Sequence, residues 1–445
     1  MLSVLAHRTY RHLFCAQVIA LVGTGLATVA LGLLAYEIAG ADAGAVLGTA
    51  LAVKMVAYIG IAPVVGAYAD RLPRKILLVA MDMVRAGVAL VLPFVDAVWQ
   101  VYLLIFLLQS ASAAFTPTFQ ATIPEILPDE KEYTNALSLS RLAYDLESLL
   151  SPVLAAALLT VISFHWLFAG TSVGFVVSAL LVVSSALPHR KAAAQAVESV
   201  WRRTTRGARI YLRTPRLMGL LAVTLAAAAG SAMVIVNTVV IVKGAGGSQQ
   251  DVALALAAYG GGSMLAALAL PRILDAVPDR SVMIAGAAVL TILLVSFGIT
   301  IEQQAGGAIA WPFLLAGWMA LGLGYSLCVT PGGRLLRRSS TEPDRPALFA
   351  AQFALSHVCW LIAYPIAGQV GARSGMAAAF LALAAVAALG VALAIWRWPR
   401  RDPDALAHEH PELPVGHPHL AEHDGSLHTH RYVIDELHGH WPGRT

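Results

Sequence analysis

The chain alternates between long apolar runs and short polar connections. Runs of about 20 residues with few or no charges surround 88–95, 101–108, 173–183 and 377–395. A helix of that length crosses the roughly 30 Å of hydrocarbon in a bilayer. Because lipid cannot satisfy free backbone groups, such runs must be helical. The pattern therefore predicts an all-α membrane protein.

Turn and charge signals divide the apolar runs into twelve predicted spans. A polar stretch at 188–215 separates six spans from six, which predicts an N-terminal half at 1–187, a linker at 188–215, a C-terminal half at 216–401 and a tail at 402–445. The first run is too long for a signal peptide, so no cleavable one is expected. The spans are placed at 11–35, 45–68, 76–95, 98–120, 137–160, 165–187, 216–242, 251–272, 280–301, 310–333, 347–371 and 376–397.

Composition agrees with this pattern and excludes a soluble protein. Hydrophobic residues make up 58% of the chain and charged residues 13%, against roughly 25% charged in a soluble domain. Basic residues gather in the loops of one side, whereas the opposite loops hold only Lys243 and Arg373. Since positive loops stay in the cytoplasm, we expect a bacterial inner-membrane protein with both termini and the linker cytoplasmic. A monomer without a nucleic-acid partner is expected.

The loop after the second span carries the most specific motif. It reads G-A-Y-A-D-R-L-P-R-K, with Gly66, Asp70, Arg71, Arg74 and Lys75 at the defining positions. Glycine permits close helix approach, and the aspartate is suited to a helix N-terminus. The loop resembles the G-x-x-x-D-R-x-x-R-K signature of the major facilitator superfamily. That resemblance implies two six-helix halves and alternating access, with this loop as the gating latch.

The resemblance extends over residues 7–400. Stretches at 82–86, 123–125 and 135–141 are similar to the exporter branch that includes siderophore and resistance permeases. The fourth span lacks the Arg of many proton-coupled members, and the Gly-Pro pattern of drug antiporters is missing near Ser151. The familiar proton-coupling residues are therefore not carried over to this chain.

Charges inside the spans are candidates for ion coupling, because each costs at least about 2.5–3.5 kcal/mol to insert. Asp82 and Arg85 lie three residues apart, and Arg141 and Asp145 four apart, so each pair can neutralise itself on one helix face. Glu147 has no such partner on its own helix. We take Asp82, Asp145 and Glu147 as coupling candidates, with structural ion pairing favoured for the first two.

Few metal ligands lie inside the spans. The transport-site candidates are His357, together with Gln352, and Asn237, which lies four residues after Met233. A lone intramembrane histidine is more often a packing residue that is hydrogen-bonded, so this alternative stays open. No prosthetic group is expected.

The tail changes composition abruptly. It is rich in Pro, Asp, Glu and His, which predicts disorder, and it holds four histidine pairs of identical spacing. Neutral imidazole is a common metal ligand, and imidazole with carboxylate suits Ni²⁺, Co²⁺, Zn²⁺ or Cu²⁺ better than Cu⁺. The predicted metal ligands of the tail are His408, His410, His417, His419, His423, His428, His430, His438 and His440.

An exporter-branch sequence with such a tail is similar to the nickel-resistance permeases of the NreB type. This resemblance implies a secondary exporter of Ni²⁺, with Co²⁺ as a second substrate, that confers metal resistance. The ion would be both substrate and tail ligand, and protons would be the counter-ion, since no phosphate-cradling G-x-x-x-x-G-K-[ST] motif occurs. Two alternatives remain: an exporter of a siderophore, metal chelate or drug, and a membrane metal sensor without transport.

Overall fold

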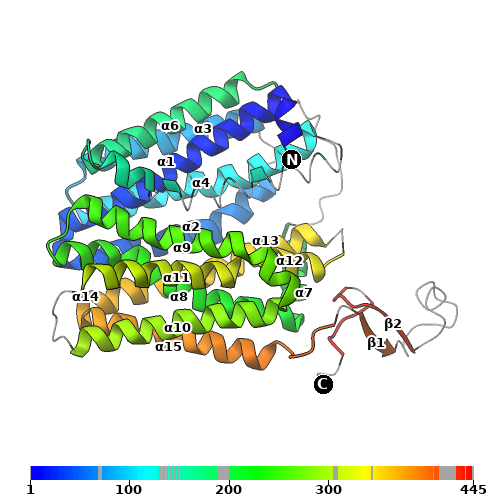
Figure 1. Ribbon diagram of the computed structural model, residues 1–445. Coiled ribbons are helices and arrows are strands. Elements are labelled where there is room, and N and C mark those ends of the chain that lie inside the picture. Colours follow the sequence, from blue (N-terminus) through cyan, green and yellow to red (C-terminus); the bar gives the residue numbers. More distant parts are fainter. Residues whose placement is uncertain are drawn as a thin grey trace.

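Helices form nearly all of the computed structural model (Figure 1). The structure describes residues 2–445 except 69–72, 128, 130–131, 133–135, 137–138, 141–142, 144–146, 148–149, 152, 188–199, 304–308, 342–343, 404, 410–426, 436 and 443–445.

The N-terminal half follows the predicted spans closely. The expected span at 137–160 lies partly outside the described residues, and its described positions up to 158 are helical. The helices of this half are η1 (Leu2–Ala6), α1 (Arg8–Ala39), η2 (Gly40–Asp42), α2 (Ala43–Tyr68), α3 (Arg74–Val91), η3 (Leu92–Phe94), α4 (Val98–Ile126) and α6 (Phe164–Ser184).

The C-terminal half contains the remaining predicted spans. Pro365 begins a five-residue π-helical turn, η4 (Ile366–Val370), within the eleventh span. The helices of this half are α8 (Pro215–Gly244), α9 (Gln249–Ala276), α10 (Asp279–Gln303), α11 (Trp311–Val329), α12 (Gly332–Arg338), α13 (Arg345–Pro365), α14 (Gly371–Ser374) and α15 (Met376–Arg397).

The outer surface of the bundle is apolar. Ten described segments are long and apolar enough to cross a membrane, and one of them, Arg8–Ile61, runs through both α1 and α2. Large apolar side chains are exposed on this surface. Their exposure would be unfavourable in water but is favourable in lipid. Among them are Phe94, Trp99, Leu180, Leu268, Ile292 and Ile395.

The predicted linker contains a helix, α7 (Val200–Arg213). Tyr211 is fully buried, and its hydroxyl donates a hydrogen bond to Gln352 of α13. Arg206 Nε lies 2.7 Å from Asp344 just before α13. The linker helix is thus fixed to the C-terminal half.

The two halves touch through α2, which packs on α13 and, at one end of the bundle, on η4. Gln369 Nε2 donates to Thr49 Oγ1 over 3.1 Å. A Cβ on Gly48 would lie 2.5 Å from the Tyr364 carbonyl, and one on Gly368 would overlap the Gly44 carbonyl. These glycines are therefore required for backbone-to-backbone contact. We call this the opposite end, and the end with Arg74, Arg213, Arg334 and Arg397 the basic end.

The prediction of a disordered tail is wrong for its described strands. β1 (Ala405–Glu409) pairs antiparallel with β2 (Leu427–Arg431), with His408 opposite His428. Composition alone does not contain the order of the residues along the chain. Histidines that alternate with other residues fit the two-residue period of a strand. Figure 1 shows the hairpin beside the basic end.

Candidate functional site

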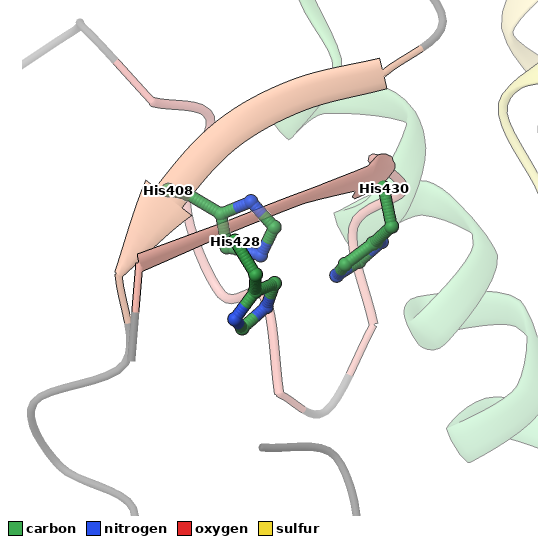
Figure 2. A group of neighbouring side chains, drawn as sticks. All are labelled: His408, His428 and His430. Carbon is green, nitrogen blue, oxygen red and sulfur yellow. The ribbon is translucent and has the colours of Figure 1, made fainter. Parts of the chain in front are cut away.

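The tail strands gather histidines on one face of the hairpin. Side chains two residues apart share a strand face, so His428 and His430 point the same way, toward His408 on the neighbouring strand (Figure 2). One nitrogen from each of the three imidazoles lies within 4.8 Å of the others. A spacing of two residues would place two side chains on opposite sides of a helix, but it places them on one side of a strand.

A fourth imidazole completes the group. His438 Nε2 lies 3.1 Å from His408 Nε2, and the two ring centroids are 4.9 Å apart. Its Nδ1 contacts Asp435 Oδ1 at 2.9 Å. We call His408, His428, His430 and His438 the histidine cluster.

Hydrogen bonds at Nδ1 set the protonation of the cluster. His408 Nδ1 lies 3.0 Å from the Leu406 carbonyl and His430 Nδ1 2.8 Å from the Arg431 carbonyl. Carbonyl and carboxylate oxygens only accept, so Nδ1 carries the proton in these rings and in His438. In the neutral ring Nε2 then holds the lone pair, as in many metal-binding histidines whose second nitrogen is held by a carboxylate or carbonyl.

The facing lone pairs suit a divalent ion. Nitrogens about 2.1 Å from one ion lie about 3.0–3.4 Å apart in octahedral or tetrahedral arrangements, and His408 and His438 are separated by 3.1 Å. Desolvation, reinforced by the neighbouring imidazoles and opposed by the Leu406 carbonyl, lowers the pKa of His408 to about 4. His408 is therefore neutral near pH 7, the form that binds a metal.

Asp435, beside the cluster, is held in its ionised form. Partial burial alone would raise the pKa of Asp435, but hydrogen bonds from His438 and Leu437 hold that pKa below its usual range. The carboxylate thus stays ionised and orients His438, as carboxylates that hydrogen-bond a metal-binding histidine do.

The hairpin is docked on the bundle. Arg431 donates to the Arg337 carbonyl over 2.7 Å, and Arg213 to the Gly439 carbonyl over 2.9 Å. The Arg216 guanidinium lies 5.0 Å from the Trp441 ring centroid. The histidine cluster therefore stands at the basic end, beside α7, α8 and α12.

Of the other predicted tail ligands, His440 alone lies among the described residues. His440 is exposed, and its carbonyl accepts from Tyr432. The remaining four fall outside the described residues: His410, His417, His419 and His423.

Within the membrane helices, Asp82 forms the predicted ion pair with Arg85. Both side chains are buried, and Ser178 donates to the second carboxylate oxygen of Asp82 over 2.7 Å. The Arg85 guanidinium lies between Phe115 and Phe175 at 4.2 and 4.5 Å from their ring centroids. This closed pair inside the N-terminal half fits the structural role. Asp145 and Arg141 lie outside the described residues.

Glu147 has a partner that its own helix does not supply. It interacts electrostatically with Lys54 of α2, and its carboxylate lies so near α1 that a Cβ on Gly25 would meet it at 2.7 Å. Lys54 also lines a cavity of about 20 Å³ in this half with Thr24, Thr28 and Gln109, room for about one water. A sequence reading could not pair residues on two different helices.

His357 faces the same helix from the other half. Its ring stacks on Tyr58 of α2 with centroids 5.3 Å apart and an interplanar angle of 8°. Lys54 lies 5.9 Å from that tyrosine ring and interacts with His357. His357 Nδ1 donates to the Phe353 carbonyl over 2.6 Å, which leaves Nε2 as acceptor. Lys54, Tyr58, Glu147 and His357 thus form a polar layer between the halves, which we call the central layer.

The other two transport-site candidates lie elsewhere. Gln352 binds Tyr211 of the linker helix. Asn237 is fully buried at the opposite end, where Nδ2 donates to the Ala367 carbonyl over 2.9 Å and to Met233 sulfur over 3.3 Å. Ala367 is ten residues beyond His357, about 15 Å along a helix. The three candidates therefore do not form one site.

The signature loop is only partly described. Gly66 is in α2, and Asp70 and Arg71 lie outside the described residues. Lys75 Nζ donates to the Ser185 carbonyl over 3.0 Å, which satisfies a carbonyl at the C-terminal end of α6. Its predicted gating role stays a prediction.

Comparison with known proteins defines the class. Two overlapping stretches, residues 13–246 and 220–428, match the Major Facilitator Superfamily. The chain belongs to this superfamily, whose members are transporters, and it is a multi-pass membrane protein.

Particular relatives are distant. Macrolide efflux protein A of Streptococcus pyogenes is 26% identical over 152 residues, 32% of this chain and 37% of the relative's length. The uncharacterised MFS-type transporter YfiS of Bacillus subtilis (strain 168) is 28% identical over 120 residues, 27% of this chain and 28% of YfiS. The chain thus aligns with 37% of the length of the first relative and with 28% of the length of the second.

Solved structures show the same fold. A bacterial homologue of the human lysosomal transporter Spinster, in an inward-facing and unoccupied conformation, matches 89% of this chain and 99% of its own (TM-score 0.68, 11% identity). The D-xylose–proton symporter matches 88% and 97% (TM-score 0.64, 15% identity). At these identities the likeness extends to the fold alone.

Proposed function

We propose that this protein exports a divalent transition-metal ion, Ni²⁺ first and Co²⁺ second, from the cytoplasm across a bacterial inner membrane. The observation that carries the proposal is the histidine cluster, docked at the basic end of a major facilitator bundle. Loops rich in arginine face the cytoplasm, so the cluster would hold the ion where export begins.

The central layer supports a pathway between the halves. His357 of the C-terminal half offers an imidazole nitrogen opposite Lys54 and Tyr58 of the N-terminal half. A neutral imidazole is a suitable transient ligand for Ni²⁺. In alternating access, the contact between α2 and η4 would close the opposite end while the ion enters from the cytoplasm.

Glu147 would couple export to protons. This carboxylate lies inside the bundle beside Lys54. The free energy of its protonation therefore depends on the charge of that partner. Entry of a divalent cation near Lys54 would alter that balance, and protonation of Glu147 from the outside would reset it. Asp82 is tied to Arg85 and Ser178, so it would keep a structural role.

Metal accumulation in cells without their own exporters tests the proposal. Cells carrying the protein should hold less nickel than cells without it, and Glu147→Gln should abolish the difference at equal protein level. Cobalt, zinc and copper are measured in the same cells. Unchanged levels of all four metals would rule out metal export and leave a metal sensor or an organic exporter.

A second candidate is export of an organic molecule, with the tail as a metal-responsive regulator. The specific observation in its favour is the partial likeness to macrolide efflux protein A. Resistance to a macrolide that depends on the protein, with nickel content unchanged, would support this candidate against metal export.

A further inference from the structure

A cavity at the basic end is lined by arginines from three elements. Its volume is about 450 Å³, within the roughly 300–1,000 Å³ of small-molecule sites. Arg334, Arg337 and Arg338 come from α12, Arg345 begins α13, and Arg431 ends β2 of the tail. Residues almost a hundred positions apart thus line one cavity.

The described carboxylates neutralise only part of this charge. Asp279 lies 3.4 Å from Arg334 Nε and 4.0 Å from Arg338 Nη1. Asp402 lies 3.6 Å from Arg338 and is shared with Arg216 at 3.3 Å. Two carboxylates therefore face the five guanidinium groups of the cavity. One of them, Asp402, also pairs with a sixth guanidinium group, that of Arg216.

Two further features favour an anion there. Among the described residues, Arg345 Nε is buried without a hydrogen-bond partner. A buried donor of this kind costs free energy unless a ligand accepts its hydrogen bond. Arg345 also begins the 21-residue helix α13, and a helix N-terminus attracts anions. Topology alone requires basic loops, but it does not require their guanidinium groups to line one cavity.

We propose that this cavity binds a phosphate-bearing anion, which bridges α12, α13 and the tail. Planar guanidinium groups bind phosphate oxygens in pairs, and several of them match a group with more than one negative charge. The same chemistry is offered by a soluble phosphate compound and by the headgroup of an anionic phospholipid. Because Arg431 belongs to β2, the bound anion would hold the hairpin on the bundle.

Binding to the purified full-length protein tests this directly. The first arm titrates inorganic pyrophosphate into protein in uncharged detergent and measures heat. The second arm measures, by native mass spectrometry, phosphatidylglycerol retained by protein extracted from nanodiscs. Arg337→Gln is the main variant because Arg337 is exposed; Arg345→Gln is the second. Arg400→Gln is the matched control, since Arg400 is also exposed near the basic end and does not line the cavity.

Saturable pyrophosphate binding that weakens at least tenfold in Arg337→Gln and Arg345→Gln, but not in Arg400→Gln, supports a soluble phosphate ligand. Retained phosphatidylglycerol with the same variant pattern, and no pyrophosphate binding, supports a lipid headgroup. Absence of both, or equal weakening in all three variants, overturns the proposal. Neither arm depends on metal transport, so the result stands apart from the proposed function.

Discussion

His408 lies directly opposite His428 across the tail hairpin, and their ring centroids are 4.6 Å apart. A cross-strand pair of this kind brings two imidazoles together on one face of the hairpin. A metal ion bound by both rings would therefore favour the pairing of the strands, and the paired strands would favour its binding.

Replacing His408 and His428 together by Ala should weaken Ni²⁺ binding to the full-length protein at least tenfold, because two of four imidazoles are lost. Isothermal titration of the purified protein measures the change. His440→Ala is the control, since His440 is in the same tail but exposed and outside the cluster. Equal affinities of the double variant and the control would mean that the ion binds elsewhere.

Acid should release the hairpin. The pKa of His408 is about 4 in the folded tail and about 6.5 for a free imidazole. Between these values the unfolded tail takes up a proton that the hairpin does not. The contribution of neutral His408 to the stability of the hairpin is therefore fully present above pH about 6.5 and is lost as pH falls towards about 4. Hydrogen–deuterium exchange of Leu427–Arg431, corrected for intrinsic rates, should show falling protection from pH 7.5 to 5. Constant protection over that range would contradict the assignment.

Glu147→Gln should lower nickel export at least tenfold and flatten its dependence on pH, since the variant cannot exchange a proton. Efflux from vesicles at several external pH values measures both effects. Lys54→Met should also lower export, because it leaves the Glu147 carboxylate in the membrane without its partner. Export that keeps its wild-type pH dependence in Glu147→Gln would assign coupling to another group.

Asp82→Asn should act on folding and leave transport per folded molecule intact. Breaking a buried ion pair costs about 3–5 kcal/mol, so the yield of protein that stays monodisperse after mild heating should fall. The rate of export, normalised to that folded fraction, should match the wild type. A well-folded Asp82→Asn protein without export would instead make Asp82 a coupling residue.

Gly48→Ala should slow transport at least tenfold, because the added Cβ meets the Tyr364 carbonyl at 2.5 Å and keeps α2 from closing on the eleventh span. Labelling of Ala45→Cys by an impermeant maleimide should increase in the same variant. Gly60→Ala is the control on α2, since nothing lies within 4 Å of a Cβ there. Equal transport by the two variants would remove the gating role of this contact.

The membrane fold was predictable because hydrophobic length decides it. The span expected at 216–242 is α8 at Pro215–Gly244, and that at 376–397 is α15 at Met376–Arg397. The linker helix α7 was missed, although the apolar Ile210 and Tyr211 beside its arginines signal a helix with one buried side. Boundaries in the membrane follow composition, whereas a short surface helix depends on what it packs against.

The sites were only partly predictable. The pairing of Asp82 with Arg85 follows from one helix turn, whereas that of Glu147 with Lys54 joins two helices far apart in the sequence. Composition predicted the tail histidines as metal ligands, and this stays a prediction. That His408 meets His428 and His438 depends on strand register, which composition does not contain.

The position of the docked tail determines where an affinity tag should be attached. Trp441 lies against Arg216, and the rings of Tyr432 and Trp441 have centroids 5.3 Å apart. A tag of consecutive histidines added after Trp441 would therefore lie near the histidine cluster. A chain that binds nickel as proposed would be captured by nickel resin without a tag, and a nickel titration of the tagged chain would report the affinity of the tag. A peptide epitope before Arg8 keeps the two apart.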